Sequence, residues 1–433
     1  MSEDWRIEID QWTSRIALPM RLVIVAILLG AVGEPMEAYG IFGQAKEKFE
    51  KLGDPSGIAV TLWQLGMIEQ SRGNYDEAKK LHNEAIGIFE KLGDQSRIAA
   101  VLHNLAMIEE SRCNYDEAER MYNQILNIKR ELGNEIGMAS TLHQLGNIQI
   151  ERSNYDQARN LYHQSLQIEQ KYGNEAEVAT TLFELATIDG KTGNYDEARK
   201  LLNQSLELHQ RLVGQPGVAA TLSELGSLEY SKGSYDKAKD LYARAMAILE
   251  KLGNQEGIAL TLHRLAMVEE ELNNYDEAKR IFNQSLEISR RIGYQSGTAQ
   301  TLHELGIIEQ KSGNRDEAES LYNQSLDVNR RLGNQSGIAN ALHQLGMIEQ
   351  DRGNYDDAEK LYSQALEIRR NIGDQLGIAV TTAQLGVLAE KKDDSRLAEK
   401  LYQEAHRIFQ KLGAKSYLDI IEKCLENVRR PKV

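Results

Sequence analysis

Five of the nine histidines recur at one position of a 40-residue period, namely His103, His143, His263, His303 and His343. An imidazole can bind a metal ion, or it can donate and accept hydrogen bonds. Metal ligation needs several donors at about 2 Å from one ion, whereas neighbouring helices pack about 8–10 Å apart. The spacing therefore disfavours a metal site. Two interpretations stay open: the histidines hydrogen-bond an extended peptide backbone, or they are near-copies inherited by duplication that make solvent and interhelix contacts alone.

Two further files of similar side chains accompany the histidines. The histidine position itself is occupied by Trp63 and Phe183 in two other copies of the period. The adjacent position carries mostly amides, and methionine recurs four residues after the histidine position. The candidates are Gln64, Asn104, Gln144 and Gln344 in the first file, and Met67, Met107, Asn147, Met267 and Met347 in the second. Amides suit a peptide backbone, and methionine adapts to varied apolar side chains. These residues are the candidate contacts with a partner.

Motifs for catalysis are missing from the sequence. Gly190-Lys191-Thr192 imitates the end of a phosphate-binding loop, but Leu185 stands where the leading glycine would be. The run from His303 to Ile307 lacks the second histidine of a zinc protease. We therefore expect neither an enzyme nor a bound cofactor.

The composition narrows the class of partner. The chain has 51 Lys and Arg against 65 Asp and Glu, a net charge of −14. Nucleic-acid binding needs a basic face, so this balance argues against it. The two cysteines, Cys113 and Cys424, offer no disulfide framework, which favours a reducing, cytoplasmic location. The sequence leaves open whether the recurring acids Glu109, Glu269, Glu309 and Glu349 select basic peptides or merely solubilise the protein.

The elements that carry these residues are pairs of helices. In the first full copy, Leu62 and Leu65 share one face of a first helix with Gly66, whose small size predicts the close approach of a neighbour. A second helix begins at Asn74 and ends at Gly93. The residues at its start resemble a capping box in which Asn74 is the N-cap. Asp94 and Asn134, with their equivalents, are positioned to cap the next first helix. Since one such pair cannot bury its apolar face alone, the copies must stack.

At this level of detail the chain resembles tetratricopeptide repeat (TPR) proteins. The residues that match the family signature are Leu62, Leu65, Gly66, Gly73, Tyr75, Ala78 and Ala85. The unit has 40 residues instead of the family's usual 34, as in the repeats of kinesin light chains. The resemblance implies an all-α, right-handed α-solenoid of about ten helix-turn-helix repeats, forming a superhelix with a concave groove. It implies that the first helices line this groove, so the His, amide and Met files would bind a protein or peptide partner there.

Family analogy also supports two other functions. One is a sensor or regulatory arm that controls a separately encoded effector, such as a nucleotide-binding switch protein, a protease or a transcription factor. The other is a receptor for a signalling peptide.

The period divides the chain into a degenerate repeat, nine full repeats and two ends. We expect a capping helix and a degenerate first helix over residues 1–32, a degenerate second helix over 33–53, nine full repeats over 54–413 and a capping helix over 414–433. The apolar run 22–32 has three explanations: a membrane span, a signal segment, or a first helix covered by a stripe of Trp5, Ile9, Trp12 and Ile16. We favour the covered helix, and an uncovered one would offer a surface for homo-oligomers.

Overall fold

The protein is helical throughout the part of the chain that the structure describes. This computed structural model describes residues 18–31, 33–152 and 154–429, and the stripe from Trp5 to Ile16 lies outside them. The described residues form helices joined by short turns, with no strand among them. The prediction of an all-α fold of repeated helix pairs is confirmed.

The chain divides into two units, residues 1–212 and 213–433. The helices of the first unit are α2 (Leu18–Ala31), α3 (Pro35–Leu52), α4 (Pro55–Ser71), α5 (Tyr75–Leu92), α6 (Gln95–Ser111), α7 (Tyr115–Glu131), α8 (Glu135–Glu151), α9 (Tyr155–Tyr172), α10 (Glu175–Lys191) and α11 (Tyr195–Arg211). Those of the second unit are α12 (Gln215–Ser231), α13 (Tyr235–Leu252), α14 (Gln255–Glu271), α15 (Tyr275–Arg291), α16 (Gln295–Lys311), α17 (Arg315–Leu332), α18 (Gln335–Arg352), α19 (Tyr355–Ile372), α20 (Gln375–Lys391), α21 (Ser395–Leu412) and α22 (Lys415–Arg429).

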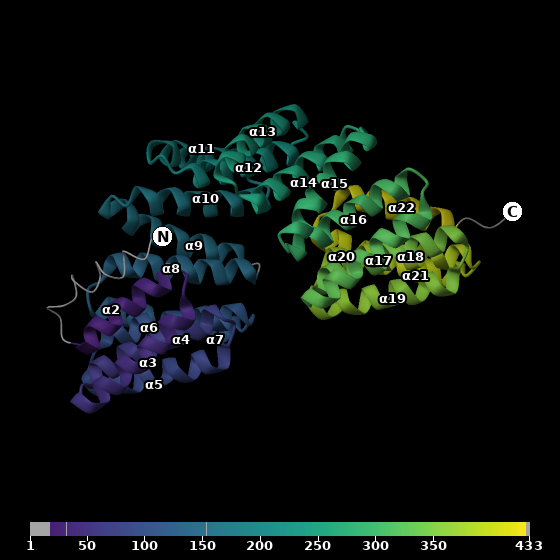
Figure 1. Ribbon diagram of the computed structural model, residues 1–433. Coiled ribbons are helices and arrows are strands. Elements are labelled where there is room, and N and C mark those ends of the chain that lie inside the picture. The colour runs from purple at the N-terminus through teal and green to yellow at the C-terminus, as the bar shows by residue number, and fades with distance from the viewer. Residues whose placement is uncertain (1–17, 32, 153, 430–433) are drawn as a thin grey trace. The chain divides into compact units, whose positions relative to one another are not determined.

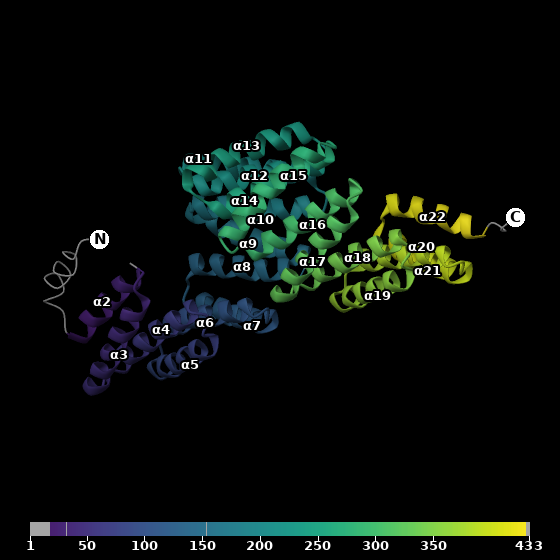
Figure 2. The ribbon, with the colours of Figure 1, turned by 45° about the vertical axis from the view of Figure 1, so that its right-hand side comes forward.

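Each even-numbered helix from α2 to α20, here called an A helix, packs against the odd-numbered B helix that follows it, and α22 packs on α21 (Figure 1). The same pairing is visible from a second direction in Figure 2. Successive A helices also touch one another, as α4 does α6 in the first unit and α14 does α16 in the second, more closely than successive B helices do. The A helices therefore form the tighter of the two layers within each unit.

Where the small residue in the middle of an A helix is a glycine, it faces a ring of its own B helix. A Cβ atom on Gly346 would lie 2.8 Å from Cε1 of Tyr362, and one on Gly146 would lie 2.7 Å from Cε1 of Tyr162. Both tyrosines are fully buried. The expected close approach at this position is confirmed, and its cause is an aromatic side chain that fills the space that a larger residue would occupy.

Several A helices are capped as the sequence predicted, whereas Asn174 and Tyr294 at the same position of other repeats make no cap bond. The side chain of Asp94 accepts a hydrogen bond from the Arg97 amide at 3.0 Å, and that of Asn134 accepts one from the Gly137 amide at 2.8 Å. Gly93 ends the preceding B helix with φ +70°, in the left-handed region that favours glycine. Val213 takes the same conformation at φ 56° although it is β-branched, so this one turn is strained.

The prediction of a capping box at the start of the B helices is wrong. Asn74 makes no side-chain cap bond; its amide nitrogen instead donates to a carboxylate oxygen of Glu69, on the preceding A helix, at 2.6 Å. Asn314 likewise donates to Glu309 at 2.7 Å. The asparagine ties the turn to the A helix because that helix's buried carboxylate needs donors.

The recurring acids near the ends of the A helices pair with the preceding repeat. Glu109 is buried and accepts from Nζ of Lys79 at 2.5 Å, and the equivalent contacts join Glu269 to Lys239 at 2.5 Å and Glu309 to Lys279. In the last of these contacts the two charges have changed places along the chain. Arg429 stands at the repeat position of the acid and Glu399 at that of the lysine, and Nε of Arg429 lies 2.7 Å from Glu399. The charges of Glu109, Glu269 and Glu309 are therefore used between repeats.

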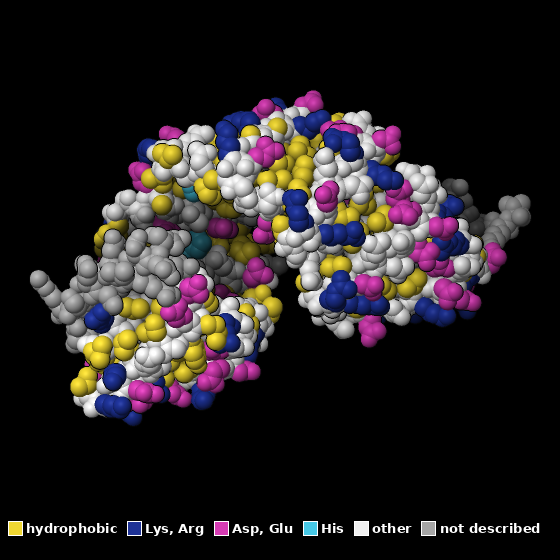
Figure 3. Space-filling model, viewed as in Figure 1, with side chains coloured by type: hydrophobic (Ala, Val, Ile, Leu, Met, Phe, Trp, Pro, Cys, Tyr) yellow, Lys and Arg dark blue, Asp and Glu magenta, His cyan; other side chains and the backbone are white. Residues whose placement is uncertain are grey.

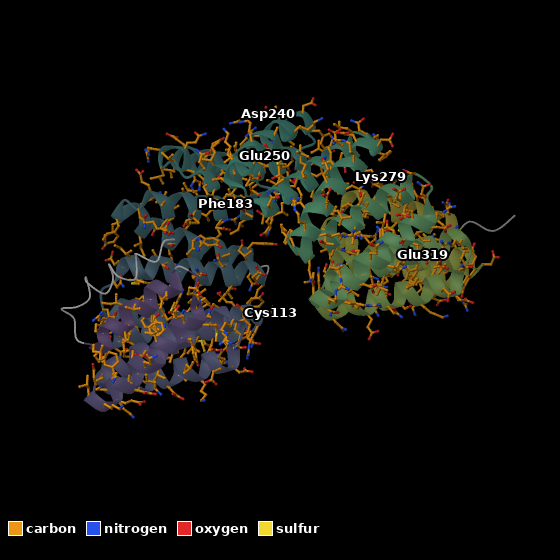
Figure 4. All side chains as sticks on the ribbon, in the orientation of Figure 1. Cys113, Phe183, Asp240, Glu250, Lys279 and Glu319 are labelled. Atoms are coloured by element: carbon orange, nitrogen blue, oxygen red, sulfur yellow. The ribbon has the colours of Figure 1, made fainter. Side chains whose placement is uncertain are left out.

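Where the usual cation is itself replaced by an acid, another residue compensates. Glu319 stands at the Lys279 position one repeat on, and both are labelled in Figure 4. Arg352 then contacts Glu319 at 2.6 Å, Glu349 at 2.8 Å and Asp316 at 2.6 Å. The repeats are thus joined by complementary charges, which is consistent with the mixed acidic and basic surface in Figure 3.

Replacement of Lys279 by methionine tests this pairing. Burial alone would raise the pKa of Glu309, but the bonds from Lys279 and Asn314 outweigh burial and hold that pKa below its usual value. Without Lys279 the buried carboxylate loses its counter-charge, so we expect about 2–3 kcal/mol less unfolding free energy at neutral pH. Chemical denaturation measures this. Lys360→Met, which removes an exposed pair with Asp357, is the control and should cost less than about 1 kcal/mol; equal losses would contradict the argument.

The apolar run near the N-terminus forms α2, which packs on α3. Val23, Ala26 and Leu29 are buried, while Leu18 and Ile27 are exposed. Among the described residues, no helix combines the length and the apolar character that a membrane crossing requires. At the other end, α22 buries Ile421 and Leu425.

Candidate functional site

The candidate histidines lie on the A helices, with their rings against the B helix of the same repeat. In the first unit, His103 packs on Tyr122 and His143 on Tyr162, with ring centroids 5.6 and 5.1 Å apart. In the second unit, the pairs are His263 with Phe282, His303 with Tyr322 and His343 with Tyr362, at 5.2–5.5 Å. His343 is buried, 7 % exposed, and the other four are half-buried. One face of each ring is therefore part of the packing.

Burial keeps these imidazoles neutral. It lowers the pKa of His263 and of His303 to about 4, and that of His343 to about 3, with the charge of Arg369 adding to the effect at His343. The pKa values of His103 and His143 are lowered for the same reason. A neutral imidazole has one donor and one acceptor nitrogen, so at neutral pH these side chains can exchange hydrogen bonds and carry no charge.

Two of the rings are joined to the next repeat. Nδ1 of His263 lies 3.1 Å from Oγ1 of Thr301, and Nδ1 of His343 lies 3.3 Å from Oγ1 of Thr381. In the first unit, Nε2 of His143 is buried without a hydrogen-bond partner. The histidines thus combine interhelix contacts with ring nitrogens that remain for other groups.

The neighbouring files are more accessible in the first unit. Met67 and Met107 are 40 % and 41 % exposed. Trp63 donates through Nε1 to Oδ1 of Asn104, one repeat on, at 2.9 Å. Phe183, labelled on α10 in Figure 4, is half-buried, as is Gln64. An apolar surface with indole and amide groups therefore covers part of α4 and α6.

Further along the first unit the amides bond to one another. Asn147 donates to Oε1 of Gln144 at 3.2 Å and accepts from the hydroxyl of the buried Tyr162 at 2.6 Å. In the second unit, Gln344, Met267 and Met347 are half-buried. The amide and Met files are consequently partly engaged in packing.

A residue that the sequence analysis did not single out is Glu304, beside His303. Burial raises the pKa of Glu304 to about 7, and the charge of Glu270 adds to the rise while Lys311 opposes it. The sequence offered one signal for it, because Glu304 is a carboxylate at a position that carries mostly amides. Among the described residues there is no cluster of three or more His, Cys, Asp or Glu that could hold a metal ion.

A model of the tetratricopeptide repeat matches most of the chain, at residues 57–131, 137–211, 177–251, 257–331 and 337–411. Curated protein sequences give no match.

Several solved structures share the fold. Aspartyl phosphate phosphatase F from Bacillus subtilis aligns with a TM-score of 0.57 and 13 % identity, over 75 % of this chain and 88 % of that one. The quorum sensor NprR from B. thuringiensis aligns with a TM-score of 0.57 and 12 % identity, over 84 % and 99 %. A signal transduction ATPase with a tetratricopeptide repeat sensor from Pyrococcus horikoshii aligns with a TM-score of 0.56 and 15 % identity, over 85 % of this chain and 55 % of that one. At these identities the likeness concerns the fold alone.

Proposed function

This chain belongs to the tetratricopeptide repeat family, and we propose that it binds an extended segment of a partner protein along the A helices. The observation that carries the proposal is the exposed apolar and amide surface at Met67, Met107 and the Trp63–Asn104 pair. Thioethers adapt to varied apolar side chains, while indole and amide groups supply hydrogen bonds to a peptide backbone.

The tighter packing of the A helices supports placing the groove on their side. A layer whose helices lie closer together than those of the partner layer is the inner one of a curved array. In this arrangement the neutral histidines lie deeper than the exposed methionines, because their side chains are half-buried or buried. They support the exposed methionines and contribute nitrogen atoms at the floor of the groove.

A peptide selected from a random display library provides the probe for this proposal. We expect Met67→Lys combined with Met107→Lys to weaken its binding at least about tenfold, because two charges replace apolar contacts at the centre of the surface. Fluorescence anisotropy of the labelled peptide measures the affinity. Met36→Lys is the matched control, since Met36 is 61 % exposed on the B helix α3.

The control variant should bind the peptide as the wild type does. A peptide whose affinity is unchanged in the double variant, or equally reduced in the control, would place the binding surface elsewhere. Failure to select any binder would count against the proposal as a whole.

The regulatory alternatives use the same surface with a different ligand. Structures of similar fold include the quorum sensor NprR and a Rap protein complexed with Competence and Sporulation Factor. A sensor arm would retain a separately encoded protein in a pull-down from the native cell extract, and a signalling-peptide receptor would retain a short peptide instead. Mass spectrometry of the retained material separates the two.

A further inference from the structure

A cleft in the first unit contains a buried carboxylate with an unused oxygen. The cleft, about 380 Å³ in volume, lies between α8, α9 and the start of α10. Its lining includes Ile136, Ser140, Ile168, Glu169, Tyr172 and Glu177. Glu169 is 5 % exposed, and its Oε2 has no hydrogen-bond partner.

The same repeat position carries a cation elsewhere in the chain. Lys129 donates through Nζ to the Gly137 carbonyl at 2.9 Å and to Oγ1 of Thr141 at 2.8 Å. Arg369 donates through Nη1 to the Gly377 carbonyl and to Oγ1 of Thr381, at 2.8 and 2.5 Å. The space between a B-helix end and the following A helix therefore accommodates an ammonium or guanidinium group, and at Glu169 the chain supplies an anion there instead.

The hydrogen bonds of Glu169 use one oxygen of its carboxyl group and leave the other without a protein partner. Oε1 of Glu169 accepts from Oγ1 of Thr181 at 3.1 Å and from Oγ of Ser165 at 2.7 Å, and Ser165 also lies 2.7 Å from the Ala139 carbonyl. Its counterpart Ser205 donates to the Ala179 carbonyl at 2.7 Å. Burial raises the pKa of Glu169, Ser165 and Thr181 oppose the rise, and Glu177 adds to it.

The nearby charges leave this carboxyl without a cation of its own. Lys171 on α9 is held by Glu135 on α8, which also accepts from the Tyr172 hydroxyl at 3.2 Å. Glu177 on α10 is exposed and adds a second negative charge at the cleft. Asn174 lines the mouth and makes no cap bond to α10, unlike Asn134 on α8. The walls at Ile136, Ile168 and the Tyr172 ring are apolar.

We infer that this cleft binds a guanidinium or primary ammonium group carried on an aliphatic stem. The cation pairs with Oε2 of Glu169, Glu177 adds attraction at the mouth, and the stem packs on the two isoleucines and Tyr172. If the cation is an Arg or Lys side chain of the bound segment, this inference rests on the proposed function and deepens it. The cleft is lined by Ile136 and Ser140, which lie on the same helix as His143. A free alkyl cation is the other source of the group.

N-butylguanidinium and its neutral analogue N-butylurea test the cleft without a peptide. Calorimetric titration of the full chain at neutral pH should show at least about tenfold tighter binding of the cation, because the pair with Glu169 forms only with a charged ligand. Equal binding of the two ligands, or none of the cation, would refute the inference.

Glu169→Gln keeps the size of the side chain and removes its ability to ionise. We expect it to abolish the preference for the cation, with an unchanged melting temperature. Glu207→Gln, the control, removes an exposed carboxylate one helix pair further along the chain. Its affinity for N-butylguanidinium should stay within about twofold of that of the wild type. Ser140→Phe fills the cleft while sparing Glu169, and it should lose binding as well. Full binding by Glu169→Gln would show that this carboxylate is not the site.

A capped peptide with a single arginine, compared with its citrulline analogue, separates the two sources. Binding of the arginine peptide at least about tenfold tighter than butylguanidinium assigns the site to a partner side chain, and similar affinities assign it to a free cation. Failure of these titrations leaves the peptide experiment at Met67 and Met107 unaffected, because that surface lies on other helices. The two proposals can therefore fail separately.

Discussion

Replacement of Tyr362 by alanine is expected to lower the unfolding free energy by about 3–5 kcal/mol, which is the range for removing a large buried aromatic side chain. The ring is fully buried between Gly346 and His343, so its loss opens a cavity in the middle of a helix pair. Urea denaturation of the variant should show a clearly lower midpoint.

Tyr362→Phe is the matched control for this variant. The hydroxyl of Tyr362 lies 3.4 Å from Oε1 of Gln350, a weak hydrogen bond whose loss should cost less than about 1 kcal/mol. The same position is held by other buried side chains elsewhere, namely His82, Leu202 and Phe282, so it requires a buried side chain and no hydroxyl. An equal cost for the phenylalanine and alanine variants would mean that the hydroxyl matters more than the packing.

Acidification is expected to destabilise the second unit, through its buried histidines. His263, His303 and His343 have folded-state pKa values of about 4, 4 and 3, below the ordinary value of 6.5. Between pH 6.5 and pH 4 the unfolded chain therefore binds more protons than the folded one, and stability falls as the pH falls. At pH 5 each histidine contributes a loss of at most about 2 kcal/mol relative to neutral pH.

Glu304 acts in the opposite direction. Its folded-state pKa of about 7 lies above the usual value of 4.5, so its neutral form favours the folded state and stability is lost as the pH rises through this window. With three histidines against one glutamate, the net effect of acid remains a loss. Denaturation of the wild type and of His343→Gln at pH 7 and pH 5 isolates one histidine: the variant should show a smaller difference between the two pH values. An identical pH dependence in both proteins would contradict a neutral buried His343.

The sequence analysis was most successful where structure depends on residues a few positions apart. The turn at Gly93 and the caps at Asp94 and Asn134 were predicted correctly, because a C′ glycine and an N-cap side chain act within one helical turn. The spacing of Leu62, Leu65 and Gly66 likewise predicted a buried face and a close contact. The apolar periodicity and the turn residues therefore determined the helix pairs and the family.

The same local reasoning failed where a distant group competes for a side chain. Asn74 has the spacing of a capping residue, yet it bonds to Glu69 across the turn. Glu309 looks like a surface acid in its own helix, because its partner Lys279 belongs to the preceding repeat, 30 residues away in the sequence. The repeat period predicted the helix position of each of these residues, but it did not show which side chains would contact one another.

The candidate surface illustrates the same division. The sequence by itself determined that His103, His143 and their equivalents occupy one register of the A helices. Only the tertiary structure decided that their rings pack on B-helix aromatics and that Met67 and Met107 stay exposed. The cleft at Glu169 is likewise visible only in the tertiary structure, because it depends on how α8, α9 and α10 pack together. Periodicity determines the face of a helix on which a side chain lies, whereas burial and charge pairing depend on how neighbouring helices are rotated and spaced.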